Sequence, residues 1–424
     1  MNSNVRILAA ALMTGVIGLM MVESVRAQSA PGSLPPAYTV SSIGTLPGGG
    51  TSQANAINSA GDVAGTALDV NNGYSDRAVL YVNGALLNLG LLGVPFPIFS
   101  EALALNDVGQ VVGDTSNGAG HAFLYTGGQL HDLTTLANAI ASQPFAINNN
   151  TQIVGNVAIM LDPSTVQWHS FYSDGVTMTD LTARLGGPDY SEAHGINEAG
   201  QIVGWRRVTD LDSHAFLLDG STVTDLGTLG GANSGAQALN SIGQVVGWSY
   251  LPEPTIGPHP FLWTTGQMTD LGLLPGALNG EADAINAAGV VVGTMHFPGY
   301  SQNTRGFVYA DGVLRDLNDL IAPNSGWLLK TAVGINAQGA ITGTGTFNGA
   351  LLGFVLHPAV MGDLNCDGVV NFADINAFIL ALGGQPGYQA AFPNCNWMLA
   401  DVNGDGQVNF ADINPFVALL SGNG

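Results

Sequence analysis

One short pattern recurs seven times along the chain and constrains its fold more than any other feature. An Asn that follows Ile or Leu stands at intervals of 48, 42, 49, 43, 46 and 50 residues, at Asn58, Asn106, Asn148, Asn197, Asn240, Asn286 and Asn336. Gly follows seven residues after every copy, and three residues after every copy except the third, which has Thr151. An Asx turn with a Gly free to take positive φ is typical of a tight hairpin. The pattern therefore predicts a series of similar hairpin units.

Each unit carries two hairpins. Apolar runs flank the Asn turn, as in residues 102–106 (ALALN) and 109–113 (GQVVG). A second hairpin follows with a two-residue turn such as NG, GG, DG or TG, as in residues 121–133 (HAFLYTGGQLHDL). Four short strands in a unit of about 46 residues are typical of a propeller blade or of a stacked solenoid.

The two ends of the repeat distinguish these architectures. The seventh unit has a third strand near residues 353–356 but no fourth, and residues 40–46 (VSSIGTL) match the fourth-strand segment 223–229 (VTDLGTL). A closed ring uses this offset to pair the first strand with the last blade, which removes its sheet edges. We therefore predict a mainly β fold, with a seven-bladed β-propeller over residues 38–358. An open β-solenoid is the alternative.

The repeated Ala-Phe-Leu and Asp-Leu-Gly elements carry a resemblance to a known family. They are clearest at His121-Ala122-Phe123 and His214-Ala215-Phe216. These units resemble the extracellular HAF repeat family of bacteria. The resemblance implies export and a repeat register, and it implies no chemistry.

A polar pair eleven residues apart recurs within the units. The pairs are Arg77 with Asn88, His121 with Asp132, His169 with Asp180, His214 with Asp225, His259 with Asp270, and Arg305 with Asp316; the seventh unit has Leu352, with Ser42 in the partner position. His–Asp pairs can be catalytic, but one active site does not need six copies. We interpret them as buried cross-strand hydrogen bonds.

A second catalytic alternative is a carboxylate pair for glycoside hydrolysis, Asp210 with Asp212, near Arg206 and Arg207. Exposed acids on propeller loops are usually solvated, so we assign no catalytic residue.

Two twelve-residue loops, 363–374 and 401–412, carry the strongest motif of the chain. Oxygen side chains occupy loop positions 1, 3, 5, 9 and 12, Gly occupies position 6, and position 7 offers a backbone carbonyl. The predicted ligands are Asp363, Asn365, Asp367, Val369, Asn371 and Asp374 in the first loop, and Asp401, Asn403, Asp405, Gln407, Asn409 and Asp412 in the second. All six acids of residues 361–424 lie in these loops, and the segment has no Lys, Arg or His. We predict two Ca²⁺ ions; two polar turns without metal are the alternative.

An apolar stripe follows each loop at helical spacing: Ile375, Phe378, Ile379 and Leu382, then Ile413, Phe416, Val417 and Leu420. We expect the two stripes to pack together as a minimal core.

In an exported protein Cys366 and Cys395 should form a disulfide, with two free thiols as the alternative. The loop spacing, the duplication, the Asp at position 12 and the following helices resemble dockerin modules. This resemblance implies docking onto a cohesin domain, although Phe372-Ala373 and Phe410-Ala411 differ from the Ser/Thr common in cellulosomal members.

The N-terminus reads as a signal peptide over residues 1–27, with Arg6 before an apolar stretch at 7–22. A membrane anchor is the alternative, although 16 apolar residues are few for a span. We predict a flexible leader at 28–37, a linker at 359–362, a calcium module at 363–424, and no membrane span after cleavage. The formal net charge of -22 argues against nucleic acid and anionic membranes as partners.

These observations leave two hypotheses for an extracellular or cell-surface protein. In the first, a non-catalytic propeller recognises a ligand, and the calcium module attaches the chain to a cohesin-like partner or another cell-surface component. In the second, the chain is a carbohydrate-active component of a polysaccharide-degrading complex. A polysaccharide is a candidate partner under both hypotheses.

Overall fold

The computed structural model describes residues 38–421, except residues 72, 94–98, 117–119, 188–189, 210, 254–256, 301–302, 323–324, 367–368 and 393–394. The predicted signal peptide and leader, residues 1–27 and 28–37, lie outside the described residues.

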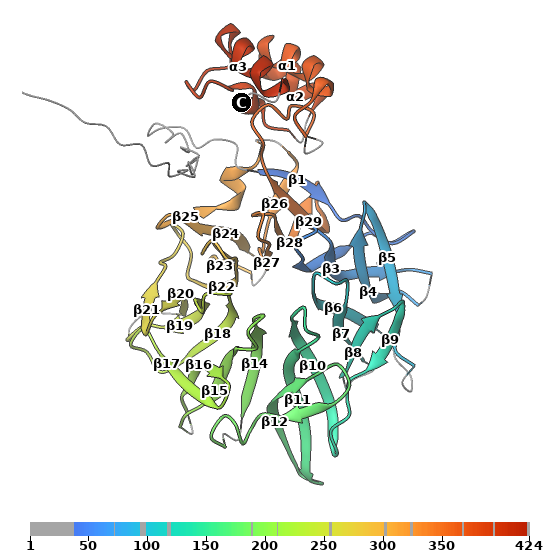
Figure 1. Ribbon diagram of the computed structural model, residues 1–424, viewed down its shortest axis with the longest axis vertical. Coiled ribbons are helices and arrows are strands. Elements are labelled where there is room, and N and C mark those ends of the chain that lie inside the picture. The colour runs from blue at the N-terminus through green and yellow to red at the C-terminus, as the bar shows by residue number, and fades with distance from the viewer. Residues whose placement is uncertain are drawn as a thin grey trace, which may run out of the picture. The chain divides into compact units, whose positions relative to one another are not determined.

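Seven antiparallel sheets surround a common axis, one sheet for each repeat unit (Figure 1). The first three are β2 (Ser52–Ile57), β3 (Val63–Asp69), β4 (Ser75–Val82) and β5 (Ala85–Gly90); β6 (Phe99–Leu105), β7 (Val111–Ser116), β8 (Gly120–Thr126) and β9 (Gln129–Asp132); and β10 (Ala139–Ile147), β11 (Ile153–Asp162), β12 (Thr165–Ser173) and β13 (Met178–Asp180). The next three are β14 (Ser191–Ile196), β15 (Ile202–Arg207), β16 (Ser213–Asp219) and β17 (Thr222–Gly227); β18 (Ser234–Leu239), β19 (Val245–Tyr250), β20 (Pro258–Thr264) and β21 (Gln267–Asp270); and β22 (Asn279–Ile285), β23 (Val291–His296), β24 (Thr304–Ala310) and β25 (Val313–Asp316), followed by the 3₁₀ helix η1 (Leu317–Leu320). The fold is the predicted seven-bladed propeller.

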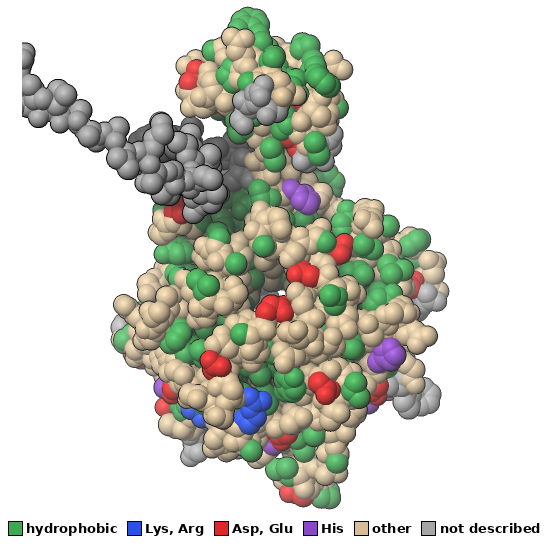
Figure 2. Space-filling view, in the orientation of Figure 1, with side chains coloured by type: hydrophobic (Ala, Val, Ile, Leu, Met, Phe, Trp, Pro, Cys, Tyr) green, Lys and Arg blue, Asp and Glu red, His purple; other side chains and the backbone are tan. Residues whose placement is uncertain are grey.

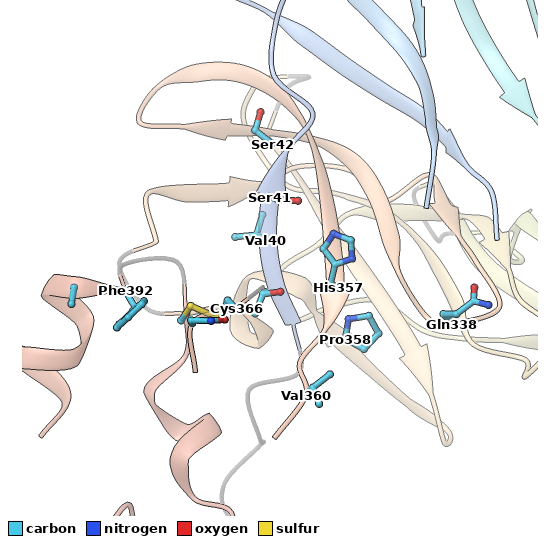
Figure 3. Close-up of a pocket in the computed structure, with 13 residues that line it drawn as sticks. Val40, Ser41, Ser42, Gln338, His357, Pro358, Val360, Cys366 and Phe392 are labelled. Carbon is cyan, nitrogen blue, oxygen red and sulfur yellow. A yellow bond between two sulfur atoms is a disulfide. The ribbon is translucent and has the colours of Figure 1, made fainter. Parts of the chain in front are cut away.

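The seventh blade joins the two ends of the repeat region. Its strands are β26 (Trp327–Leu329), β27 (Gly334–Ile335), β28 (Ile341–Phe347), β29 (Ala350–Pro358) and, as the outermost strand, β1 (Tyr38–Ser42). β1 pairs antiparallel with β29 from Tyr38 opposite Pro358 to Ser42 opposite Phe354, and Figure 3 shows the two strands side by side. The ring is therefore closed, and the open solenoid is wrong.

The core lies between neighbouring blades. The Phe of the Ala-Phe-Leu element is fully buried in six blades, at Phe123, Phe171, Phe216, Phe261, Phe307 and Phe354, and Val79 takes its place in the first. These side chains pack with Ala, Val, Ile and Leu from the inner strands of the adjacent blade. The repeated element is thus the main apolar contribution that each blade makes to the core.

The two repeated glycines serve different purposes. The Gly three residues after each Asn adopts positive φ, and Thr151 adopts a φ of 61° in the one unit that lacks it. The Gly seven residues after each Asn does not adopt positive φ. At Gly65 a Cβ would overlap the carbonyl oxygen of Gln53, beside a bulge in β2 between Ala54 and Ala56. The second Gly therefore allows two backbones to approach closely.

Residues after 358 form short helices: η2 (Phe372–Asp374), α1 (Ile375–Leu382), α2 (Gln385–Ala391), η3 (Trp397–Ala400), η4 (Phe410–Asp412) and α3 (Ile413–Leu420). α2 was not predicted. The prediction that all residues of the two apolar stripes pack together is wrong. Phe378 and Phe416 are buried and stack with ring centroids 4.1 Å apart, but Ile379 and Val417 are 60% and 55% exposed. The segment between the loops completes the core with Tyr388 and Leu399, because helices of eight residues offer each other little area.

Candidate metal centre and the asparagine ring

The second loop gathers its backbone amides around two buried carboxylates. Asp401 accepts hydrogen bonds from the N–H of Asp405 (3.1 Å) and of Gly406 (2.8 Å). Asp412 accepts from the N–H of Asn403 (3.1 Å) and of Asn409 (2.9 Å). Asp401 and Asp412 are 6% and 0% exposed, so the first and last loop positions are both fixed inside the turn.

The first loop is folded in the same way. One oxygen of Asp374 accepts from the N–H of Leu364 (2.7 Å) and of Asn365 (2.9 Å), and the other accepts from the N–H of Asn371 (2.9 Å). Asp363 is buried at position 1, and Asp367 lies outside the described residues. The same pattern of hydrogen bonds to the Asp at position 12 therefore recurs in both loops.

The fourth loop position adopts left-handed φ in both copies, 59° at Cys366 and 73° at Gly404. Gly takes this conformation without strain, whereas Cys does not. Cys366 forms the predicted disulfide with Cys395, with Cα atoms 5.9 Å apart (Figure 3). The disulfide therefore holds the less favourable residue in the loop conformation.

The ninth and twelfth positions also begin the helices. The side-chain oxygens of Asn371 and Asn409 accept from the N–H of Ala373 (2.7 Å) and Ala411 (2.8 Å). Asp374 and Asp412 complete a capping box in each copy. Sequence reasoning assigned these four residues to the metal alone and missed their role as caps.

The donor set fits Ca²⁺, a hard cation that prefers oxygen ligands. Asp363, Asp374, Asp401 and Asp412 are all buried, in a segment without Lys, Arg or His. Burial, followed by the charges of Asp363 and Asp374, raises the pKa of Tyr388. In the described parts of the chain, no three Asp, Glu, His or Cys side chains lie close enough together to hold a metal ion. The side chains at the middle positions of the second loop, Asn403, Asp405 and Gln407, are exposed. Asn side chains and backbone carbonyls would therefore complete the coordination.

The seven repeated Asn residues form a closed hydrogen-bonded ring in the propeller. Each Nδ2 donates to the backbone carbonyl of the corresponding Asn in the next blade, at 2.9–3.3 Å, and Asn336 closes the ring on Asn58 at 3.0 Å. Each Oδ1 accepts N–H groups of its own turn, as Asn197 does from Ala199 and Gln201. The sequence predicted the turn but not the bond between blades.

A second set of bonds between blades was missed. The Ser that stands six residues before the repeated Asn accepts an N–H from the third strand of the preceding blade. Ser100 bonds Ala78, Ser142 bonds Ala122, Ser191 bonds Ser170, Ser234 bonds Ala215, and Ser52 bonds Gly353 across the closure, all at 2.9–3.1 Å. The Ser stands six residues before the Asn in five units, and this constant spacing could have indicated a repeated role for the Ser.

Five of the six eleven-residue pairs form as cross-strand contacts, whereas Asn88, the predicted partner of Arg77, donates its side-chain amide to Asp69 at 3.1 Å. His169–Asp180, His214–Asp225, His259–Asp270 and Arg305–Asp316 lie at 2.8–3.0 Å, and His121–Asp132 at 3.8 Å. They are less buried than expected, since the Asp225 side chain is 41% exposed. The Asp also caps its own turn, as Asp270 does for the N–H of Gly272 at 2.7 Å. Asp210 of the second catalytic alternative lies outside the described residues.

A carboxyl pair in the second blade has a perturbed acidity. Glu101 and Asp114 stand opposite each other on β6 and β7, and Gln143 of the next blade donates to both. Burial and then the charge of Glu101 raise the pKa of Asp114 to about 7. Burial and the charge of Glu281 likewise raise the pKa of Asp283. Figure 2 shows several acidic side chains around the hollow at the centre of the ring.

The fold and loops together define a seven-bladed β-propeller followed by a paired loop–helix module. Residues 361–415 match the sequence profile described as "Dockerin type I domain", and dockerin type I domains bind calcium and attach to cohesin partners. The described part of the chain has no helix long and apolar enough to cross a membrane. No functionally curated protein matches the chain.

Several solved structures are similar to the propeller region. A puromycin hydrolase S511A mutant complexed with PGG is 12% identical, with 70% of this chain and 50% of that chain covered and a TM-score of 0.49. An acylaminoacyl peptidase of Pyrococcus horikoshii is 10% identical, with coverages of 69% and 49% and a TM-score of 0.43. The chain thus spans about half the length of these proteins. The β-propeller domain of the Trilobed protease from Pyrococcus furiosus is 10% identical, with coverages of 67% and 97% and a TM-score of 0.32. These likenesses are too distant to carry an argument about activity.

Proposed function

We propose that this protein is an exported recognition component, attached by residues 363–424 to a cohesin domain in a calcium-dependent manner. The observation that carries the proposal is the dockerin match at 361–415, together with four buried carboxylates in a segment whose sequence contains no Lys, Arg or His. Two bound Ca²⁺ ions would neutralise these carboxylates and hold the loops in shape, because metal binding and folding are coupled in small metal-binding modules.

An exposed apolar surface supports a protein partner for this segment. Phe372 and Phe410, at loop position 10, are 75% and 78% exposed, and Ile379 and Val417 lie on the following helices. Large apolar side chains exposed together commonly mark a protein interface. The Phe residues would replace the hydroxyl groups of cellulosomal dockerins with an apolar contact, so we expect a cohesin with an apolar face.

For the propeller we propose recognition without catalysis. Its repeated polar residues form structural bonds between strands and blades, and the dockerin match does not extend into it. The second candidate function is glycoside hydrolysis, favoured by the Glu101–Asp114 pair, in which one carboxyl group holds a proton near neutral pH. Asp114 is 4% exposed, which leaves a substrate little access. Activity on a polysaccharide that Asp114→Asn abolishes would favour this candidate.

The test of attachment uses the full chain on an immobilised cohesin panel. We expect retention in calcium, release by EDTA, and at least tenfold weaker binding after Phe372→Ser with Phe410→Ser. Val176→Ser with Val313→Ser, two exposed propeller positions, is the matched control and should bind as the wild type does. Retention in EDTA would refute the calcium-dependent role.

A further inference from the structure

A cavity of about 360 Å³ opens on the axis of the propeller, at the end where the asparagine ring lies. All seven blades line it with the Ile or Leu before each ring Asn and with the residue after it, and six of them also contribute the ring Asn itself. The aliphatic side chains provide an apolar lining, while the residues after the Asn, here called the rim, are exposed. The volume is in the lower part of the range for small-ligand sites, about 300–1,000 Å³.

On one half of the rim the protein satisfies its own backbone donors. The N–H of Ser59 donates to Asp107 (2.8 Å), that of Asp107 to the side chain of Asn149 (2.8 Å), and that of Asn149 to Glu198 (3.1 Å). Each bond runs from one blade to the rim side chain of the next. These three contacts show that a carbonyl or carboxylate oxygen fits this position of the ring.

The other half of the rim lacks these acceptors. Around the ring Ser241 is followed by Ala287, and Ala287 by Ala337, whose methyl groups cannot accept a hydrogen bond. Among the described residues no acceptor meets the N–H of Ser241, Ala287 or Ala337. Adjacent residues whose backbone donors lack a protein acceptor therefore line an accessible cavity that also has aliphatic side chains in its lining.

The ligand that suits this half of the rim must accept hydrogen bonds and be neutral. The two rim carboxylates, Asp107 and Glu198, lie on the other half of the rim and already accept hydrogen bonds from Ser59 and Asn149, so a ligand cation would find no carboxylate beside the free donors. The net charge of -22 disfavours a free anion. An acetamido group supplies a carbonyl oxygen for the donors and a methyl group for the apolar lining.

We propose that this half of the rim binds the end of a saccharide that carries an acetamido group. This inference rests on the recognition role proposed above for the propeller. The acetamido carbonyl accepts from the N–H groups of Ser241 and Ala287, and the methyl group packs on the neighbouring Ile and Leu side chains.

The first test compares two probes on the full calcium-loaded chain by titration calorimetry. N,N′-diacetylchitobiose should bind at least tenfold more tightly than cellobiose, which has the same linkage without the acetamido groups. No binding of diacetylchitobiose, or equal binding of both sugars, would overturn the inference. Tighter binding of a neutral blocked dipeptide at the same rim would overturn the assignment to a sugar.

The second test blocks the site with the protein's own acceptor. Ala287→Asp places a carboxylate beside the N–H of Ser241, as Asp107 stands beside that of Ser59, so stability should be kept while diacetylchitobiose binding falls at least tenfold. Ala288→Asp adds the same charge one residue away, outside the cavity lining, and should bind as the wild type does. Equal binding by Ala287→Asp and wild type would refute the site.

Hydrogen exchange on the wild type gives a readout that needs no variant. Diacetylchitobiose should slow exchange in residues 239–243 and 285–289 and leave 57–61 unchanged, because the Ser59 N–H is already bonded. If diacetylchitobiose slows exchange only outside residues 239–243 and 285–289 while cohesin attachment is intact, this site is wrong and the proposed function still stands. Calcium-independent attachment would instead overturn the proposed function.

Discussion

At the scale of single residues, the repeated Asn is the most informative position in the chain. Its Oδ1 closes a turn and its Nδ2 joins neighbouring blades, as at Asn197 with Ala199 and Asn240. The sequence predicted the first role, because Asx turns are local and have a fixed spacing. The second role depends on how the blades meet around the axis, which local sequence does not reveal.

The first prediction concerns this double role. Asn197→Ala removes two accepted and two donated hydrogen bonds at a position 7% exposed, so we expect a loss of about 2–3 kcal/mol in the free energy of unfolding. Urea denaturation measures it. Asn150→Ala removes only one long, exposed hydrogen bond, from the Asn150 side chain to the carbonyl of Glu198 at 3.4 Å, and should change stability by less than about 0.5 kcal/mol. Equal effects of the two substitutions would contradict the role of the ring.

The second prediction follows from the acidity of Asp114. Its pKa is raised from 3.8 to about 7 in the folded protein, so between these values the folded state holds a proton that the unfolded chain has released. Stability should therefore fall as pH rises from about 4 to 7 and level off above. Asp114→Asn should flatten this slope and raise Tm by a few degrees at pH 8. Asp76→Asn, on an exposed carboxylate, is the control; an unchanged slope in Asp114→Asn would refute the coupling.

At the scale of elements, hairpins were predictable and helix packing was not. The four strands of a blade follow from alternation and turn residues between neighbours in sequence. In the C-terminal segment Ile379 was expected inside and is 60% exposed, because α2 and Tyr388 take part of the core. The sequence gives α2 no strong apolar period: its seven residues are QPGYQAA. Short helices with mixed composition are set by tertiary packing, not by their own pattern.

The third prediction tests the closing strand. Deleting residues 38–46 removes β1 and leaves β29 with an unpaired edge, so the propeller should lose stability and aggregate more readily. Deleting residues 28–37 is the control of similar length and should leave Tm within about 1–2 °C, less than the shift expected from a loss of 1 kcal/mol. Equal melting of the two deletion variants would contradict the closing role of β1.

The fourth prediction concerns the two calcium loops. Calorimetric titration of the metal-free full chain should show two Ca²⁺ ions, and Asp363→Ala or Asp401→Ala should leave one, because each removes the first ligand of one loop. Asp76→Ala, an exposed propeller carboxylate, should leave two. One ion or none in the wild type would refute the paired-site proposal.

At the scale of the whole molecule, the chain combines a closed propeller ring with a C-terminal segment that matches the dockerin type I profile. The ring is closed by β1 and β29 and by the bond from Asn336 to Asn58. The dockerin match begins at residue 361, beyond the end of β29 at Pro358. The repeat and the loops were readable from sequence because both have strict spacing. The ligand proposed for the propeller could not be predicted from the sequence, because it depends on which backbone N–H groups come together around the axis.

The central claim is that attachment belongs to the calcium segment and recognition to the propeller. The most direct measurement compares the full chain with a chain truncated after Pro358 on an immobilised cohesin, in calcium and in EDTA, with circular dichroism to confirm that the truncated chain is folded. The account predicts that only the full chain in calcium is retained, while the truncated chain keeps its β-sheet spectrum and its ligand binding. Retention of the folded, truncated chain, or of the full chain in EDTA, would contradict the account.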